Sequence, residues 1–281
     1  MQYLGMRRLI FIFLFPLLAG VEVYAQDIGS YLGDESFLYA ETKQINQFFR
    51  RFNSEEDLEG KRLYEGNPNY RNPIFRANYI KMLFDGQNPN ISEETKVDFI
   101  EDVTELSKPS YLDYYGGRWF AEVDTKFIYK GQPRTVVLFL ELEKENLGIK
   151  WVINNVYFYP FTKLFYTDST AMAKFLHPMS HEIDFMNLIK VFGDPRTVEY
   201  YFDEDYKPDF KTLFLYEVKT GNLVFETIEK VSFHFFQLND WYFQLKEFNR
   251  QSYNNGWLIS NISRIPEEQK DMLLKYIYYE N

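Results

Sequence analysis

The sequence contains no cysteine, only three histidines, and fewer basic than acidic residues. The absence of cysteine excludes disulfide frameworks, zinc–thiolate sites, iron–sulfur clusters and thiol nucleophiles. The only candidates for imidazole chemistry are the three histidines, His177, His181 and His234. With 31 Lys and Arg against 41 Asp and Glu, the net charge of −10 leaves no basic excess to neutralise phosphates, so nucleic acid is not an expected partner.

Aromatic residues are abundant instead, and they make up 20% of the 281 residues. Disordered chains are poor in aromatic side chains, so we expect a folded protein of one or two domains with a sizeable core. Aromatic surfaces also bind sugars and other proteins, because a ring offers a large contact area with a polar edge. Composition does not separate the packing role from the binding role.

The N-terminal residues have the pattern of a secretory signal peptide. Arg7 and Arg8 precede an apolar run over residues 9–18, and the small-residue exit VYA ends at Ala25. We predict that residues 1–25 are cleaved and that the protein is exported, periplasmic or secreted. The apolar run is shorter than the roughly 20 residues of a membrane-spanning helix. An uncleaved anchor is the alternative, but we expect no membrane-spanning segment after cleavage.

The first half of the remaining chain reads as helices followed by strands. Apolar residues at helical spacing predict helices over 34–53, 76–85 and 92–105, and Ser92 is expected to cap the last of them. A loop is predicted over 54–75. From Trp119 the period changes to two, which predicts strands over 119–129, 135–145 and 149–159 joined by short turns. This is the pattern of an antiparallel meander.

The second half repeats this order. A helix is predicted over 180–192, followed by strands at about 211–218, 223–230, 231–238, 241–249 and 256–264. The segments GIKWVINNVYF (148–158) and GWLISNISRI (256–265) match when Trp151 is aligned with Trp257 and Ile153 with Ile259. The match predicts two halves of similar structure.

Helices followed by a long, bent antiparallel meander that ends in a Trp-x-Ile strand resemble the nuclear-transport-factor-2-like (cystatin-like cone) superfamily. The resemblance implies an α+β fold of two tandem cone-like domains, residues 26–165 and 166–281. Each would have N-terminal helices packed on a strongly bent antiparallel sheet. The alternative is one continuous sheet that carries all the helices.

Two motifs could carry histidine chemistry. His177 and His181 have the i, i+4 spacing of a helical metal site, but Pro178 and the better cap Ser180 place His177 outside the helix. Ordinary polar residues at a helix entry are favoured, and no metal or other cofactor is predicted. His234 lies among phenylalanines on a strand. Enzymes of the resembled superfamily place Asp or His inside the cone, but no Asp of the same half lies opposite His234, so a structural role is favoured.

Several carboxylates alternate along the predicted strands. Paired carboxylates can hydrolyse glycosides, and Glu122 with Asp124 lies on a strand next to Glu141, Glu143 and Glu145. Acidic residues that alternate with aliphatic ones are also typical of a solvated sheet face, and this interpretation is favoured. The familiar hydrolase and nucleotide-binding motifs are absent from the sequence.

Together these patterns favour an exported, soluble binding or scaffolding protein of the cell envelope with no catalysis of its own. Its expected partners are another envelope protein or a small apolar or sugar-like ligand. The alternative function is a small-molecule lyase or isomerase with a cone pocket around His234. The residues expected to bound a pocket are Trp119, Tyr129, Trp151 and Tyr157 in the first copy and His234, Phe236, Trp241 and Trp257 in the second.

Overall fold

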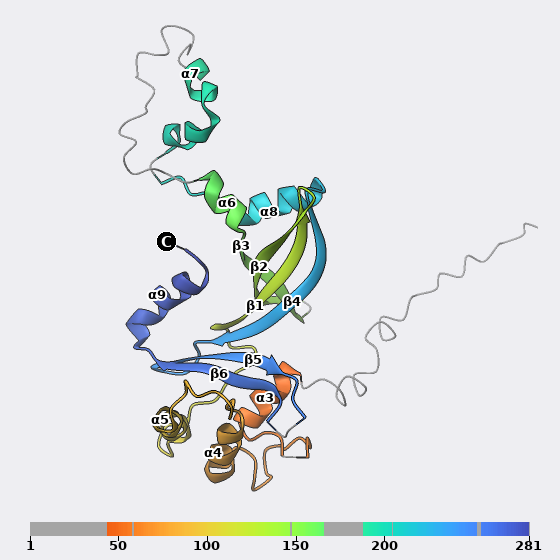
Figure 1. Ribbon diagram of the computed structural model, residues 1–281. Coiled ribbons are helices and arrows are strands. Elements are labelled where there is room, and N and C mark those ends of the chain that lie inside the picture. Colours follow the sequence, from red (N-terminus) through yellow and green to blue (C-terminus); the bar gives the residue numbers. More distant parts are fainter. Residues whose placement is uncertain are drawn as a thin grey trace, which may run out of the picture. The chain divides into compact units, whose positions relative to one another are not determined.

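The computed structural model describes residues 44–57, 59–146, 148–165, 188–203, 205–251 and 254–280 (Figure 1). The predicted signal peptide, His177 and His181 lie outside the described residues. In these ranges the helices that precede the strands are α3 (Ile45–Phe52), α4 (Pro73–Met82) and α5 (Glu93–Thr104). As predicted, Ser92 caps α5, and its hydroxyl accepts a hydrogen bond from the Thr95 N–H at 3.1 Å. Helix α4 starts three residues earlier than predicted, because Asn72 caps it and Pro73 fits its first turn.

The first meander has the predicted order, with β1 (Trp119–Tyr129), β2 (Gln132–Glu145) and β3 (Gly148–Tyr157), followed by α6 (Tyr159–Leu164). In the second half α7 (Leu188–Gly193) and the 3₁₀ helix η2 (Pro195–Tyr201) come before α8 (Phe210–Lys219). Helix α8 replaces the strand predicted over 211–218. The side chain of Asp209 accepts hydrogen bonds from the Lys211 and Thr212 N–H groups and so caps a helix there.

Three further strands and a C-terminal helix complete the chain. Strand β4 (Leu223–Phe235) runs without a break through the adjoining predicted segments 223–230 and 231–238, and it is followed by β5 (Trp241–Phe248), β6 (Gly256–Arg264) and α9 (Glu267–Ile277). Helix α9 was not predicted. None of the helices in the described ranges is long and apolar enough to cross a membrane.

All six strands form one antiparallel sheet in the order β3-β2-β1-β4-β5-β6. The α+β class and the antiparallel meanders are confirmed, but the expectation of two separate sheets is wrong. Strands β1 and β4 pair along the whole length of β1 and join the two meanders. The physical reason is that separate meanders would leave the backbone N–H and C=O groups of both strands unpaired at sheet edges. The continuous sheet of the alternative prediction is the arrangement found.

The pairing registers relate the two meanders by an approximate two-fold axis. Ala121 pairs with Phe233 across the central strands. From Ala121 the ladder leads through Leu140 to Ile153, and from Phe233 it leads through Leu245 to Ile259. Both edge strands then skip one residue, Asn154 in β3 and Ser260 in β6. The strand registers and the internal sequence match therefore identify the same pairs of equivalent residues.

The helices cover the two faces of this sheet unequally. Helices α3, α4 and α5 cover one face, and α9 covers the other, as Figure 1 shows on either side of β5 and β6. On the first face, Phe48, Phe49 and Phe52 of α3 pack in one cluster with side chains of β1, β4 and β5. Farther along the same face, α6 and α8 bury a second cluster around Phe127. The strands therefore position one large aromatic core against α3.

A buried arginine connects helices α3, α4 and α5 through hydrogen bonds. Arg76 of α4 is 1% exposed. It donates hydrogen bonds to the carbonyl oxygens of Phe52 at 3.0 Å and Val103 at 2.8 Å, and to that of Ser110. Burial lowers the pKa of Arg76 to about 10, so the guanidinium stays charged at neutral pH.

We expect Arg76→Met to lower the free energy of unfolding by about 3 kcal/mol or more, because buried carbonyl groups would lose their donor. Urea unfolding followed by circular dichroism measures the change. The matched control is Arg134→Met on the exposed start of β2, which should stay within about 0.5 kcal/mol of the wild type. Equal losses in the two variants would contradict this role of Arg76.

Candidate functional site

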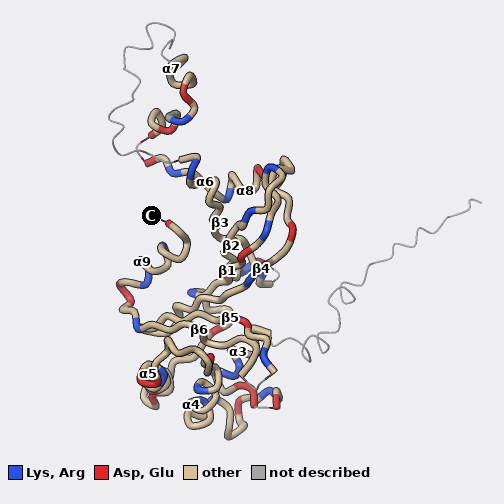
Figure 2. Tube along the Cα trace, viewed as in Figure 1, with Lys and Arg blue, Asp and Glu red and all other residues tan. Residues whose placement is uncertain are grey.

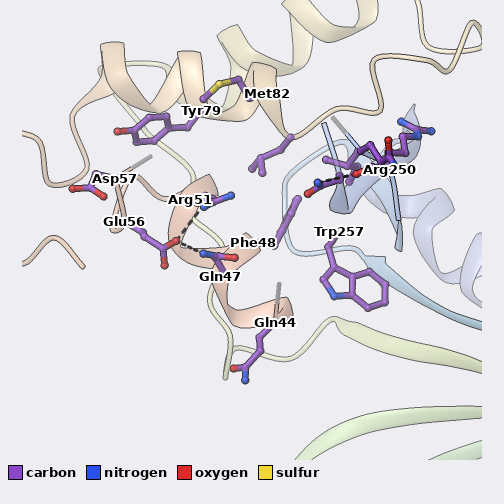
Figure 3. A pocket seen from close by; sticks show the side chains of 14 residues that line it. Gln44, Gln47, Phe48, Arg51, Glu56, Asp57, Tyr79, Met82, Arg250 and Trp257 are labelled. Carbon is purple, nitrogen blue, oxygen red and sulfur yellow. Dashed lines mark hydrogen bonds and ion pairs between the residues drawn. The ribbon is translucent and has the colours of Figure 1, made fainter. Parts of the chain in front are cut away.

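A groove of about 860 Å³ lies where α3, α4 and the start of β6 meet (Figure 3). Its walls combine apolar and aromatic side chains with amides and charged groups, a composition typical of small-molecule sites. The residues that line it are Gln44, Gln47, Phe48, Arg51, Glu56, Asp57, Tyr79, Met82, Leu83, Arg250, Gln251, Asn255, Trp257 and Leu258.

The apolar part of the groove is formed by side chains from three elements. Trp257 of β6 is half-buried, and its ring meets that of Phe233 edge-on at 4.7 Å. Phe48 of α3 belongs to the core below, whereas Met82 of α4 is 48% exposed. The indole ring of Trp257 is therefore held by the core on one side and accessible on the other, which suits a ligand with a flat apolar face.

On the polar side of the groove, a buried carboxylate fixes the positions of neighbouring side chains. Glu56 is 1% exposed, yet it is not isolated. Its carboxylate accepts hydrogen bonds from Gln47 Nε2 at 2.6 Å, Arg50 Nε at 2.8 Å and Arg51 Nε at 3.2 Å. Because Arg51 binds Glu56 through Nε, its two terminal amino groups remain as donors beside the groove. Gln47 and Arg51 are thereby fixed in orientation before any ligand binds.

The second arginine is held in a similar way. Arg250 Nη1 donates to Asp85 Oδ1 at 2.7 Å and to Asn254 Oδ1 at 3.3 Å. Burial alone would raise the pKa of Asp85, but the hydrogen bonds from Arg250 and the Gln87 N–H outweigh it and hold that pKa below its usual value. Two oriented guanidinium groups and several amides therefore surround an aromatic wall. This arrangement can bind a polar ligand.

A second polar cluster lies on the opposite face of the sheet, which α9 covers. His234 Nε2 is 2.6 Å from Glu122 Oε2, and His234 Nδ1 is 2.8 Å from Tyr242 Oη. The ring of Phe120 stacks on the imidazole at 4.9 Å. The tautomer that satisfies all three groups has Tyr242 donating to Nδ1 and Nε2–H donating to the Glu122 carboxylate.

Sequence reasoning considered only Asp residues of the same half as partners of His234, and so it missed Glu122. Glu122 comes from β1 of the first half, and the pairing of β1 with β4 brings it diagonally across from His234. Each of the two follows a residue of the Ala121–Phe233 pair, so they occupy equivalent positions about the approximate two-fold axis. A non-local strand pairing therefore creates this contact.

Burial sets the electrostatics of this cluster. It would raise the pKa of Glu122, but the hydrogen bond from His234 outweighs this effect and the pKa lies below its usual value. Burial, together with the charge of Glu122, raises the pKa of Tyr242, so its hydroxyl stays protonated. His234 itself is only 2% exposed. A ligand in the groove cannot reach it, because the groove lies on the other face of the sheet.

The eight residues predicted to bound pockets do not converge in two sites. Only Trp257 lines the groove. By strand alternation, Trp119, Tyr129, Trp151 and Trp241 share its face, whereas Tyr157, His234 and Phe236 lie on the opposite face. Trp119 and Trp241 are buried in the core, and Trp241 Nε1 donates to Asp102 Oδ2 at 3.0 Å.

Sequence reasoning missed most of the groove. Gln47 and Arg51 come from α3 and Gln44 directly precedes it, while Arg250, Gln251 and Asn255 come from the β5–β6 connection. The only sequence signal for Gln44, Gln47 and Arg51 was their place on the polar side of the predicted amphipathic helix. In the described part of the chain, no three His, Asp or Glu side chains are placed to hold a metal ion. The candidates His177 and His181 lie outside that part.

Comparison with known proteins gives no match to a family model, to a curated protein or to a solved structure. The resemblance to the nuclear-transport-factor-2-like superfamily therefore stays a prediction.

We expect Glu122→Gln to remove a pH-dependent part of the stability. Since the folded-state pKa of Glu122 lies below its unfolded value, its stabilisation is complete above the unfolded value and is lost as pH falls through the folded value. The wild type should exceed the variant by about 2 kcal/mol at pH 7, the range for hydrogen bonds to charged groups, and the gap should close towards pH 3. Urea midpoints between pH 7 and 3 measure it, with exposed Glu143→Gln as the control. A gap that does not change with pH would contradict the assignment.

Proposed function

We propose that this protein is a binding protein with no catalysis of its own, and that the groove between α3, α4 and β6 binds a small sugar-like ligand. The observation that carries the proposal is the pairing of the half-buried Trp257 indole with side-chain donors held by buried carboxylates. Sugars present apolar C–H faces and polar edges, so an aromatic wall beside fixed amide and guanidinium donors matches both surfaces.

Three features support a binding role over other functions. The donors are oriented in advance, which reduces the entropy lost on binding. Acidic and basic residues are interspersed along the described trace (Figure 2), and the net charge of −10 does not favour a polyanionic ligand. The groove lining contains no histidine.

Export belongs to the same proposal and rests on residues 1–25. The basic residues, the short apolar run and the small-residue exit are the features that signal peptidases and secretion machinery recognise. A chain without cysteine also cannot form incorrect disulfides in an oxidising compartment. The protein would then meet its sugar-like ligand, or a partner protein, in the cell envelope or outside the cell.

The test uses two tryptophans that are equivalent by the internal repeat. A panel of neutral and acidic disaccharides is titrated against the protein by isothermal calorimetry. For a disaccharide that binds, Trp257→Ala should weaken affinity tenfold or more, because the apolar wall is lost. Trp151→Ala, on the same face but outside the groove, should change it less than twofold. Failure of the whole panel to bind, or equal losses in both variants, would refute the groove as a sugar site.

The rival function, a lyase or isomerase that uses His234, has one observation in its favour. Tyr242, His234 and Glu122 form a continuous hydrogen-bonded chain like those that tune acid–base residues. The burial of His234 argues against direct contact with a substrate.

We expect His234→Ala to reduce the stability of the protein by about 2 kcal/mol, because Glu122 and Tyr242 would lose buried partners. Affinity in the groove should stay unchanged. Thermal unfolding and the same calorimetric titration measure the two effects. An unchanged melting temperature combined with lost ligand binding or turnover would favour the rival function.

A further inference from the structure

The two outer strands of the sheet are equivalent, but their outer edges differ. At β6, the segment Leu83-Phe84-Asp85 lies along the edge: the Ile259 N–H donates to the Leu83 carbonyl at 2.8 Å, and the Asp85 N–H donates to the Ile259 carbonyl at 3.0 Å. Phe84 pairs with Ile259 in a parallel bridge and is 2% exposed. The edge of β6 is thus covered by three residues of the same chain.

The same position on β3 is open in the described part of the chain. Ile153 is the equivalent of Ile259, so its N–H and C=O also face outward, and no described residue pairs with them. The two isoleucines also differ in burial: Ile259 is 0% exposed in the core cluster, whereas Ile153 is 45% exposed. Ile149 and Trp151, on the same face of β3, are 41% and 38% exposed. An unpaired edge with a row of apolar side chains is a site for strand addition.

We propose that the outer edge of β3 around Ile153 binds a short extended apolar segment of another protein, in the parallel orientation in which Leu83–Asp85 lies on β6. The segment would accept a hydrogen bond from the Ile153 N–H and donate one to the Ile153 carbonyl. Its central large apolar side chain would cover Trp151 and Ile153, as Phe84 covers the equivalent position on β6.

Two observations define this occupant. The skipped residue Asn154 bends the edge of β3, which disfavours a long paired strand. Strand β6 has the same irregularity at Ser260 and still accepts a three-residue segment, so a short segment is the right length. A second copy of this chain is a poor source, because its own Leu83–Asp85 segment is already bound to its own β6. This interaction surface is independent of the ligand groove.

The probe for this site is a fluorescein-labelled peptide with the sequence of residues 80–88, IKMLFDGQN, because this segment already fits the equivalent edge. Fluorescence anisotropy with the full chain should show saturable binding. We expect Ile153→Asp to weaken binding tenfold or more. Ile228→Asp, at a residue 56% exposed on the central strand β4, is the matched control and should leave binding within twofold. A peptide in which Phe84 is replaced by Asp should bind at least tenfold more weakly.

Amide hydrogen exchange then compares two isoleucines in the same molecule. In the protein alone, the Ile153 N–H should exchange at least 100-fold faster than the Ile259 N–H, and it should become protected when the peptide is added. No binding at millimolar peptide, or equal binding to Ile153→Asp, would overturn the proposal. Equal protection of both amides without peptide would also overturn it. Protection that grows with protein concentration would then indicate a second copy, and protection that does not would indicate a segment of the same chain.

Discussion

The antiparallel pairing of β1 with β4 is the constraint on which the rest of the structure depends. Each strand begins a meander, so without this pairing each meander would expose a long strand edge on both sides. Strand β4 carries two extra residues in the ladder, Glu226 and Glu229. One extra residue would move all following side chains to the other face, but two restore the alternation. Leu223 and Phe233 therefore lie on the same face, and one face of the sheet can hold both large core clusters.

The approximate two-fold symmetry of the sheet is broken wherever the structure has a candidate function. Trp257 lies beside α3 and α4 and lines a groove, while its equivalent Trp151 is not among the residues that line it. Glu122 and His234 are equivalent positions that carry an acid and a base, so the axis holds a complementary pair instead of two like groups. The candidate sites therefore lie where the two repeats differ, on a sheet whose strands the repeats share.

Sequence patterns predict local structure here and miss what depends on pairing between distant segments. The bounds of β1 agree with the predicted strand because a period-two run ends at the turn Lys130-Gly131. Helix α8 was predicted as a strand because a short run of aromatic and aliphatic residues fits either structure, and only the capping residue Asp209 distinguishes them. The Glu122–His234 contact joins residues 112 positions apart, so no local pattern encodes it. The single sheet follows from the same non-local pairing.

The buried carboxylates beside the groove indicate why this region was hard to predict and why it is a good candidate site. A buried charge costs free energy unless it is paired, and apolar side chains of similar volume would often stabilise a core equally well or better. Glu56 and Asp85 are nevertheless both buried, and each binds an arginine that lines the groove. Their contribution is orientation: they fix where the guanidinium donors point. Rigid polar groups are of little use to a core, but a ligand site depends on them. The observed consequence of burying these two carboxylates is therefore the fixed orientation of Arg51 and Arg250.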